Sequence, residues 1–176
     1  MILGTDFLSL KIPKLIHNLE GGCGPVSAWM VLNYFKKPVS PSRIVKACRY
    51  SKKNGTFMIC LALALRKFGL QVSFYTEADA SPHYWEKQSY RSAERNGVFV
   101  SAAISIRRLL TFVDKGYVAI VLYDLPNGEA HISPLIGQEE RRLLLPYAEG
   151  GSLSVEGFKK GWNAPGILRQ CILVSI

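Results

Sequence analysis

The sequence predicts an α+β fold in which a helical half packs on a mostly antiparallel sheet. Apolar residues at helical spacing follow Cys23, in the segment CGPVSAWMVLNYF (23–35). Two apolar runs, 117–124 and 130–137, flank a turn that carries Asn127-Gly128, and this pattern is a strong signal for a β-hairpin. The chain has 176 residues and no linker rich in Pro, Ser or Gly. We therefore expect one domain that spans residues 1–176.

Cys23 lies where the first of these helices is expected to begin. Gly21 and Gly22 precede it, and Pro25 suits a first helical turn, where its missing N–H would have no partner. The N-terminus of a helix favours an anion, so we expect this position to lower the pKa of the thiol from about 8.5 toward neutrality. The pattern favours a nucleophile, and the alternative is a buried cysteine that opens a core helix.

A nucleophilic cysteine needs a base, and the chain has three histidines, His17, His83 and His131. His131 opens the second strand of the expected hairpin, so a rigid sheet would carry it. A thiol on a helix that faces an imidazole on a sheet is the arrangement of papain-like enzymes. His83 lies in a polar and aromatic stretch, where we expect a surface position. Cys23 and His131 are therefore the candidate catalytic pair, and the alternative for His131 is a structural histidine at a strand end.

In the order of its segments the chain resembles the bacteriocin-processing cysteine peptidases, which remove double-glycine leader peptides, and their stand-alone papain-like relatives. The resemblance rests on IPKLIH as an extended lead-in, the Cys23 helix, TFMICLALALRKFG as a second helix and HISPLIG as the histidine strand. The segments QVSFY, SIRRLLTFVDKG, VAIVLY, RRLLLPYAEGG, LSVEGFKKGW and ILRQCILVSI match the remaining strands and helices of that family. Nearly the whole chain is covered, and the resemblance implies a papain-like fold and a bacterial cysteine peptidase.

Two positions depart from the family pattern. In the family a glutamine six residues before the cysteine donates to the oxyanion, and here that position is His17, whose ring N–H can also donate. The family's aspartate that orients the histidine aligns with Leu145, in the segment LLLPY, and leucine cannot orient an imidazole. Glu149, Asn163 or a backbone carbonyl remain open as substitutes for that aspartate.

The resulting functional prediction is a cysteine-dependent amide hydrolase, with peptide hydrolysis as the first choice. Cys23 would attack as a thiolate, His131 would hold and deliver the proton, and the Cys23 backbone N–H together with His17 would bind the oxyanion. Two alternatives stay open. One is deamidation of a side-chain amide on a protein partner, and the other is a peptide- or protein-binding module that has kept the fold and lost the chemistry.

The other cysteines predict neither a metal site nor disulfide bonds. Cys48, Cys60 and Cys171 lie in apolar patterns where a small hydrophobic residue fits, and no Cys-x-x-Cys pair is present. We expect four free thiols, no metal and no cofactor. The stretch 77–97, with a helix near 82–95, is expected to form the rim of a cleft.

The formal net charge of +9 favours an acidic or anionic partner. The basic residues occur as doublets scattered along the chain, and no aromatic-rich strand of the kind that binds RNA accompanies them, so we expect no nucleic-acid binding. The N-terminus lacks the pattern of a signal peptide, and no apolar run reaches the ~18 residues of a membrane span. We expect a soluble, stand-alone cytoplasmic protein, and delivery to another cell stays open.

Overall fold

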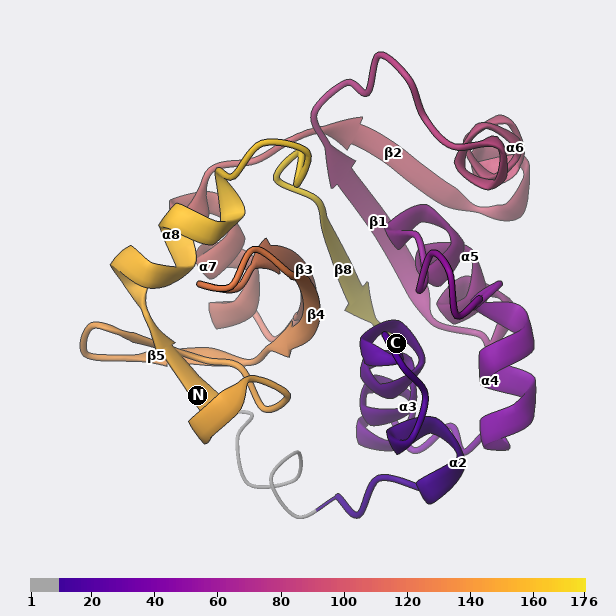
Figure 1. Cartoon of the computed structure of the whole chain (residues 1–176), viewed down its shortest axis with the longest axis horizontal. Helices are drawn as coiled ribbons and strands as arrows, with labels where there is room; N and C mark the ends of the chain where they lie inside the picture. Colours follow the sequence, from indigo (N-terminus) through magenta and orange to yellow (C-terminus); the bar gives the residue numbers. More distant parts are fainter. Residues whose placement is uncertain (1–9) are drawn as a thin grey trace.

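The computed structural model of the chain describes residues 10–176, and a central sheet divides it into two layers (Figure 1). This sheet has five strands in the order β2-β1-β8-β3-β4, and a second sheet has three short strands in the order β5-β6-β7. The strands are β1 Gln71–Thr76, β2 Val98–Ala102, β3 Val118–Asp124, β4 Ala130–Leu135, β5 Gly137–Glu139, β6 Arg142–Leu144, β7 Ser152–Ser154 and β8 Cys171–Ser175. The helices are α2 Lys14–His17, α3 Cys23–Tyr34, α4 Pro41–Ala47, α5 Met58–Lys67, α6 Tyr84–Ala93, α7 Ile106–Asp114 and α8 Val155–Trp162, with short 3₁₀ turns at Glu94–Asn96 and Glu149–Gly151.

The predicted α+β class and the mostly antiparallel sheet are confirmed. In the five-stranded sheet only β1 and β2 pair in parallel, and β8, from the C-terminal end of the chain, lies between β1 and β3. The predicted hairpin is β3–β4. Its turn is closed by two backbone hydrogen bonds, from the Leu125 N–H to the Glu129 carbonyl oxygen and from the Gly128 N–H to the Leu125 carbonyl oxygen. Gly128 takes the positive φ of 81° that such a turn needs. In its register His131 lies directly opposite Tyr123.

Three parts of the chain differ from the sequence-based expectation. The lead-in at 12–17 is not fully extended, because residues 14–17 form the single turn α2. Helix α4 was not predicted, since only Ile44 of its seven residues is buried and the apolar stripe is too narrow to recognise. Strand β2 was also missed, because of its five residues only Val98 is buried and the alternation typical of a strand is absent.

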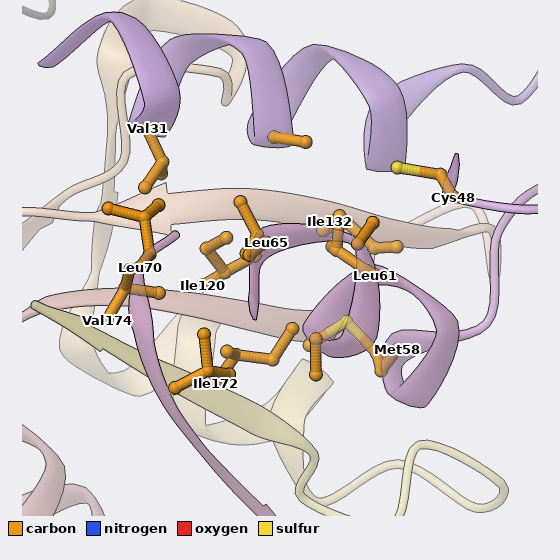
Figure 2. Close-up of a cluster of buried hydrophobic side chains, with 14 of the residues drawn as sticks. Val31, Cys48, Met58, Leu61, Leu65, Leu70, Ile120, Ile132, Ile172 and Val174 are labelled. Carbon is orange, nitrogen blue, oxygen red and sulfur yellow. The ribbon is translucent and has the colours of Figure 1, made fainter. Parts of the chain in front are cut away.

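The side chains of the central strands alternate between two apolar cores. On β3, Val118 and Ile120 point into the core shared with α3 and α5, whereas Ala119 and Val121 point into the core beneath α7 and α8. Figure 2 shows the first core, where Val31 of α3 and Leu61 and Leu65 of α5 pack with the strand residues Ile120, Ile132, Ile172 and Val174. Every one of these side chains is at most 2% exposed. The sheet is therefore held from both faces, which fixes the position of β4 and of the histidine it carries.

Helix α8 approaches the end of β3 so closely that one residue of the helix must be glycine. A Cβ atom built on Gly161 would overlap the backbone carbonyl oxygen of Asp124, the last residue of β3. Backbone atoms of a central strand cannot move aside as the end of a flexible side chain can. The small residue at position 161 thus sets the distance between α8 and the sheet.

We expect Gly161→Ala to destabilise the protein, although the same change in an exposed helix gains about 1 kcal/mol. The overlap with Asp124 should cost more than this gain, with a net loss of about 1–3 kcal/mol, as for other overpacked sites. Urea unfolding followed by circular dichroism measures the change. Lys160→Ala, at the exposed neighbouring position, is the control and should stay within about 0.5 kcal/mol of the wild type.

Candidate active site

Cys23 is the first residue of α3, as predicted, and its side chain is half-buried. The backbone N–H groups of Gly24, of Cys23 itself and of Ile132 on β4 face the sulfur, and each of them lowers the pKa of the thiol. The first two donors are the unpaired N–H groups that every helix has at its start. The third comes from the residue that follows His131, so the thiol lies against the strand that carries the candidate base.

A close contact behind the helix start holds the cysteine in this position. A Cβ atom on Gly24 would lie 2.6 Å from the Cβ of Thr56, in the loop that leads into α5. Any larger residue at position 24 would push this loop and the first turn of α3 apart. The glycine next to the cysteine therefore allows the loop before α5 to pack directly against the helix start.

Helix α3 is fixed to β4 through both backbone polar groups of one residue. The hydroxyl of Ser27 donates to the carbonyl oxygen of Ile132 at 3.1 Å, and the N–H of Ile132 donates to the sulfur of Cys23. Ser27 is fully buried, one turn after Cys23. Strand β4 is the last strand of the sheet, so its outer edge would otherwise carry unpaired groups. The start of α3 covers this edge at Ile132.

His131 is oriented by a backbone carbonyl. Its Nε2 lies 2.8 Å from the carbonyl oxygen of Tyr147. A carbonyl only accepts hydrogen bonds, so Nε2 must carry the proton and donate it. In the neutral ring Nδ1 then has the free lone pair, which is the form that a general base needs.

The backbone of Tyr147 is held in place on both sides of its Cα atom. Residues 145–148 form a tight turn, closed by a hydrogen bond of 2.8 Å from the Ala148 N–H to the Leu145 carbonyl oxygen. The N–H of Tyr147 donates to the hydroxyl of Ser133 at 3.2 Å. Ser133 and His131 are two apart on β4 and therefore share one face of the strand. Together they bind both polar groups of the Tyr147 backbone.

Two aromatic rings enclose the imidazole of His131. The Tyr147 ring stacks on it with centroids 5.3 Å apart, and the Tyr123 ring meets it edge-on at 5.6 Å. The hydroxyl of Tyr123 is buried without a hydrogen-bond partner. This packing restricts the rotation of the imidazole, so that the orientation given by the Tyr147 carbonyl is kept.

Of the substitutes considered for the missing aspartate, the backbone carbonyl is the one that the structure shows. Leu145 itself is fully buried in the core beneath α7 and α8. Glu149 is exposed, and the side-chain amide of Asn163 donates to the Lys159 carbonyl oxygen. Sequence reasoning did not identify Tyr147, because any residue type can supply a carbonyl and only the turn places this one.

The other two histidines are exposed. His83 lies at the surface as predicted, where it caps α6 by accepting from the Trp85 N–H and stacks on Phe57. His17 ends α2, and its Nδ1 lies 3.4 Å from the side-chain oxygen of Asn18. Its contribution to an oxyanion hole remains a prediction.

The expectation that the helix start lowers the pKa of the thiol is wrong for this site. Burial raises the pKa of Cys23 above its usual value of 9.0, and this effect is larger than the opposing effect of the three N–H donors. Burial also lowers the pKa of His131 below its usual value of 6.5, although the hydrogen bond to Tyr147 opposes this. Both groups are therefore neutral at pH 7, as a thiol and an imidazole. The residues next to Cys23 in the sequence do not indicate how far the folded chain excludes solvent from the thiol and the imidazole.

Comparisons with known proteins identify the fold. The peptidase domain of Streptococcus ComA, a bifunctional ABC transporter involved in a quorum-sensing pathway, matches with a TM-score of 0.58 and 16% identity, over 87% of this chain and 90% of that one. A double-glycine motif protease from an AMS/PCAT transporter, solved with its leader peptide, matches with a TM-score of 0.55 and 17% identity, over 93% and 91%. The chain has the fold of these peptidase domains.

This likeness confirms the papain-like architecture that the order of the segments predicted. At 16–17% identity it establishes the fold alone. No model of a known protein family matches the sequence, and no curated protein sequence matches it. In residues 10–176 no helix has the length and apolar composition that crossing a bilayer requires. All four cysteines are free thiols, as predicted, and Cys48, Cys60 and Cys171 are buried.

We expect the reaction of Cys23 with iodoacetamide to follow the raised pKa of its thiol. Because the thiolate is the reactive form, the rate should still be rising with pH above 9.0. The measurement is the alkylation rate of Cys23 from pH 5 to about 10, followed by mass spectrometry of the digested protein. Cys48, Cys60 and Cys171 serve as internal controls and should react only after unfolding. A rate that reaches its plateau below pH 7 would instead demonstrate a thiolate–imidazolium pair.

We expect Leu145→Asp to bring no gain in the reactivity of Cys23, since the Tyr147 carbonyl already occupies Nε2 of His131. The new carboxylate would be buried among apolar side chains, which should cost about 3 kcal/mol or more. Urea unfolding and the alkylation rate of Cys23 are the two measurements. Leu145→Met keeps the volume and should cost less than about 1.5 kcal/mol. Faster alkylation in the aspartate variant would show that the carbonyl is an ineffective partner for His131.

Proposed function

We propose that the protein is a cysteine-dependent amide hydrolase that cleaves peptides, with Cys23 as nucleophile and His131 as base. The observation that carries the proposal is the hydrogen bond from Nε2 of His131 to the Tyr147 carbonyl oxygen. It fixes the tautomer that can accept a proton at Nδ1, and the acceptor stays in place when the ring becomes charged. The placement of Cys23 against Ile132, next to His131, supports the same assignment.

The neutral pair defines the first step of the proposed reaction. The thiol of Cys23 passes its proton to Nδ1 of His131 while the sulfur attacks the carbonyl carbon of the scissile amide. The developing oxyanion is bound by the Cys23 backbone N–H and by the ring N–H of His17. The imidazolium then protonates the leaving amine, and the carbon–nitrogen bond breaks to give a thioester on Cys23. His131 activates a water molecule that hydrolyses this thioester and restores the thiol.

The Tyr147 carbonyl has a defined role in this sequence of proton transfers. When Nδ1 takes the proton, the ring becomes positively charged in a half-buried site, which by itself is unfavourable. The carbonyl dipole next to Nε2–H stabilises this charge, as the direction of its effect on the pKa of His131 indicates. A neutral carbonyl stabilises the cation less than an aspartate carboxylate does. We therefore expect a slower enzyme than one with a full triad.

Peptides that contain Gly-Gly are the first substrates to test, because one structurally similar protein is a double-glycine motif protease. Cleavage of a peptide mixture is followed by mass spectrometry with the wild type and with Cys23→Ala and His131→Ala. Either change should reduce the rate by about 10³-fold or more, as removal of a catalytic pair does in related chemistry. Cys171→Ala and His83→Ala are the matched controls, and both should retain the rate.

His17→Ala in the same assay examines the proposed oxyanion donor, whose loss should reduce turnover by about 10²-fold. His17→Gln should restore part of it, since an amide N–H can also donate. The proposal is wrong if the folded wild type binds peptides but cleaves them no faster than the Cys23→Ala variant does. The protein is then a binding module. Release of ammonia without backbone cleavage would identify a deamidase.

A further inference from the structure

A large open cavity lies between α4, α5 and α6, apart from the candidate active site. Its volume is about 1000 Å³. Figure 1 shows these three helices together on one side of the molecule, with α7 and α8 on the other side and α3 and β4 between them. None of the residues that hold Cys23 or His131 lines the cavity. Its chemistry therefore needs its own explanation.

Five cationic side chains line the cavity, and they come from two separate segments. Arg43, Lys46 and Arg49 are spaced three residues apart, so they lie along one side of α4 and the turn that follows it. Arg66 and Lys67 come from the last turn of α5. In the sequence the two groups of charges are 17 residues apart, and only Arg66-Lys67 forms one of the scattered doublets. The packing of α4 against α5 brings them together.

None of these cations forms an ion pair with a carboxylate within the part of the chain that the structure describes. The lining contains no Asp or Glu, and the two ion pairs of residues 10–176 join Lys52 to Glu20 and Arg169 to Glu77, outside the cavity. On α6, Glu86 is buried and accepts from the His83 N–H. Five like charges around one concave surface repel one another, which is unfavourable unless an anion binds there.

Three of the cations are held in place before any ligand arrives. The guanidinium of Arg43 lies 5.8 Å from the centre of the Phe68 ring, and that of Arg49 lies 5.2 Å from the Trp85 ring. Arg66 donates to the carbonyl oxygen of Leu70 at 3.2 Å. Fixed side chains lose less conformational entropy when they bind a partner, so this arrangement favours binding.

The cavity also offers apolar and uncharged polar surface. Ala47 and Leu63, which are partly exposed, supply apolar surface between α4 and α5. On the α6 side the lining is polar, with Ser89, Ser92 and Asn96. A partner that fits must therefore combine negative charges with small apolar side chains, which is the composition of an amphipathic acidic peptide.

We propose that this cavity binds an acidic segment of a peptide or protein partner, with the carboxylates of the segment paired to the five cations and its apolar side chains on Ala47 and Leu63. A nucleic acid is the less suitable occupant, because binding of single strands relies on free aromatic faces. The single aromatic residue of the described lining is Phe68, and Arg43 already covers its ring.

The position of the cavity suggests a role in substrate selection. Since α3 lies between the cavity and β4, a segment bound there would contact the protein at a distance from the bond to be cleaved (Figure 1). The identification of the acidic segment as part of a substrate rests on the proposed function, whereas the binding itself does not. Binding is therefore measured with Cys23→Ala protein, which keeps the cavity and cannot cleave the probe.

The test uses a fluorescein-labelled peptide of about 14 residues, with glutamate and leucine at helical spacing, and fluorescence anisotropy at low and at high salt. In the Cys23→Ala background, Lys46→Glu/Lys67→Glu reverses two charges of the cavity. Lys159→Glu/Lys160→Glu on α8 makes the same change in net charge at exposed positions away from it. We expect the cavity variant to raise Kd about tenfold or more and the α8 variant to leave it within about twofold.

The same peptide with glutamine in place of glutamate should bind weakly to every variant. Thermal unfolding shows that the charge-reversed proteins are folded, and Lys46→Gln/Lys67→Gln, a milder change, should give an intermediate Kd.

Equal losses of affinity in the two charge-reversed variants, or no binding to the unaltered cavity, would overturn the proposal. Tighter binding of a labelled oligonucleotide of similar length, lost in the cavity variant, would replace the acidic peptide by a nucleic acid. Peptide binding without any cleavage by the wild type would leave the cavity assigned and the proposed function wrong.

Discussion

The arrangement of the candidate site depends on the attachment of α3 to β4 at Ile132. Both backbone groups of this residue are bound by the start of α3, one by the Ser27 hydroxyl and the other by the Cys23 sulfur. A helix that carries a thiol and a strand that carries an imidazole are distant in sequence, so their relative position has no local determinant. This pair of hydrogen bonds, with the apolar core shared by α3, α5 and the sheet, supplies it. A shift of one residue between α3 and β4 would remove both hydrogen bonds.

The second constraint is the turn at 145–148, which presents a carbonyl oxygen to His131. The hydrogen bond that the Tyr147 N–H donates to the Ser133 hydroxyl holds the backbone of the turn, and stacking of the Tyr147 ring fixes the plane of the imidazole. The plane of the imidazole is thereby set by the stacked Tyr147 ring, and its positive charge is stabilised by the Tyr147 carbonyl. Burial in the same environment raises the pKa of the Cys23 thiol and lowers the pKa of the His131 imidazole, which favours the neutral form of both groups.

The parts that could be predicted from the sequence are those with a local signal. Cys23 at the start of a helix followed from Pro25 and the apolar residues after it, and the position of His131 followed from the Asn127-Gly128 hairpin. The pKa of Cys23 could not be predicted, because burial depends on segments that fold against the helix from elsewhere. The Tyr147 carbonyl and the cluster of cations between α4 and α5 could not be predicted for the same reason. Both arise where separate segments meet, and neither has a characteristic residue type at a fixed spacing.

An orienting group that belongs to the backbone has a consequence for how such proteins change over time. Every amino acid has a carbonyl, so no single substitution at position 147 can delete the group that binds Nε2 of His131. Drift at this position would alter the stacked ring and leave the acceptor in place, provided that the turn and the Ser133 hydroxyl persist. In this chain the leucine at position 145 therefore does not by itself distinguish an enzyme from a binding module. The shape of the turn after the histidine strand is the feature to compare.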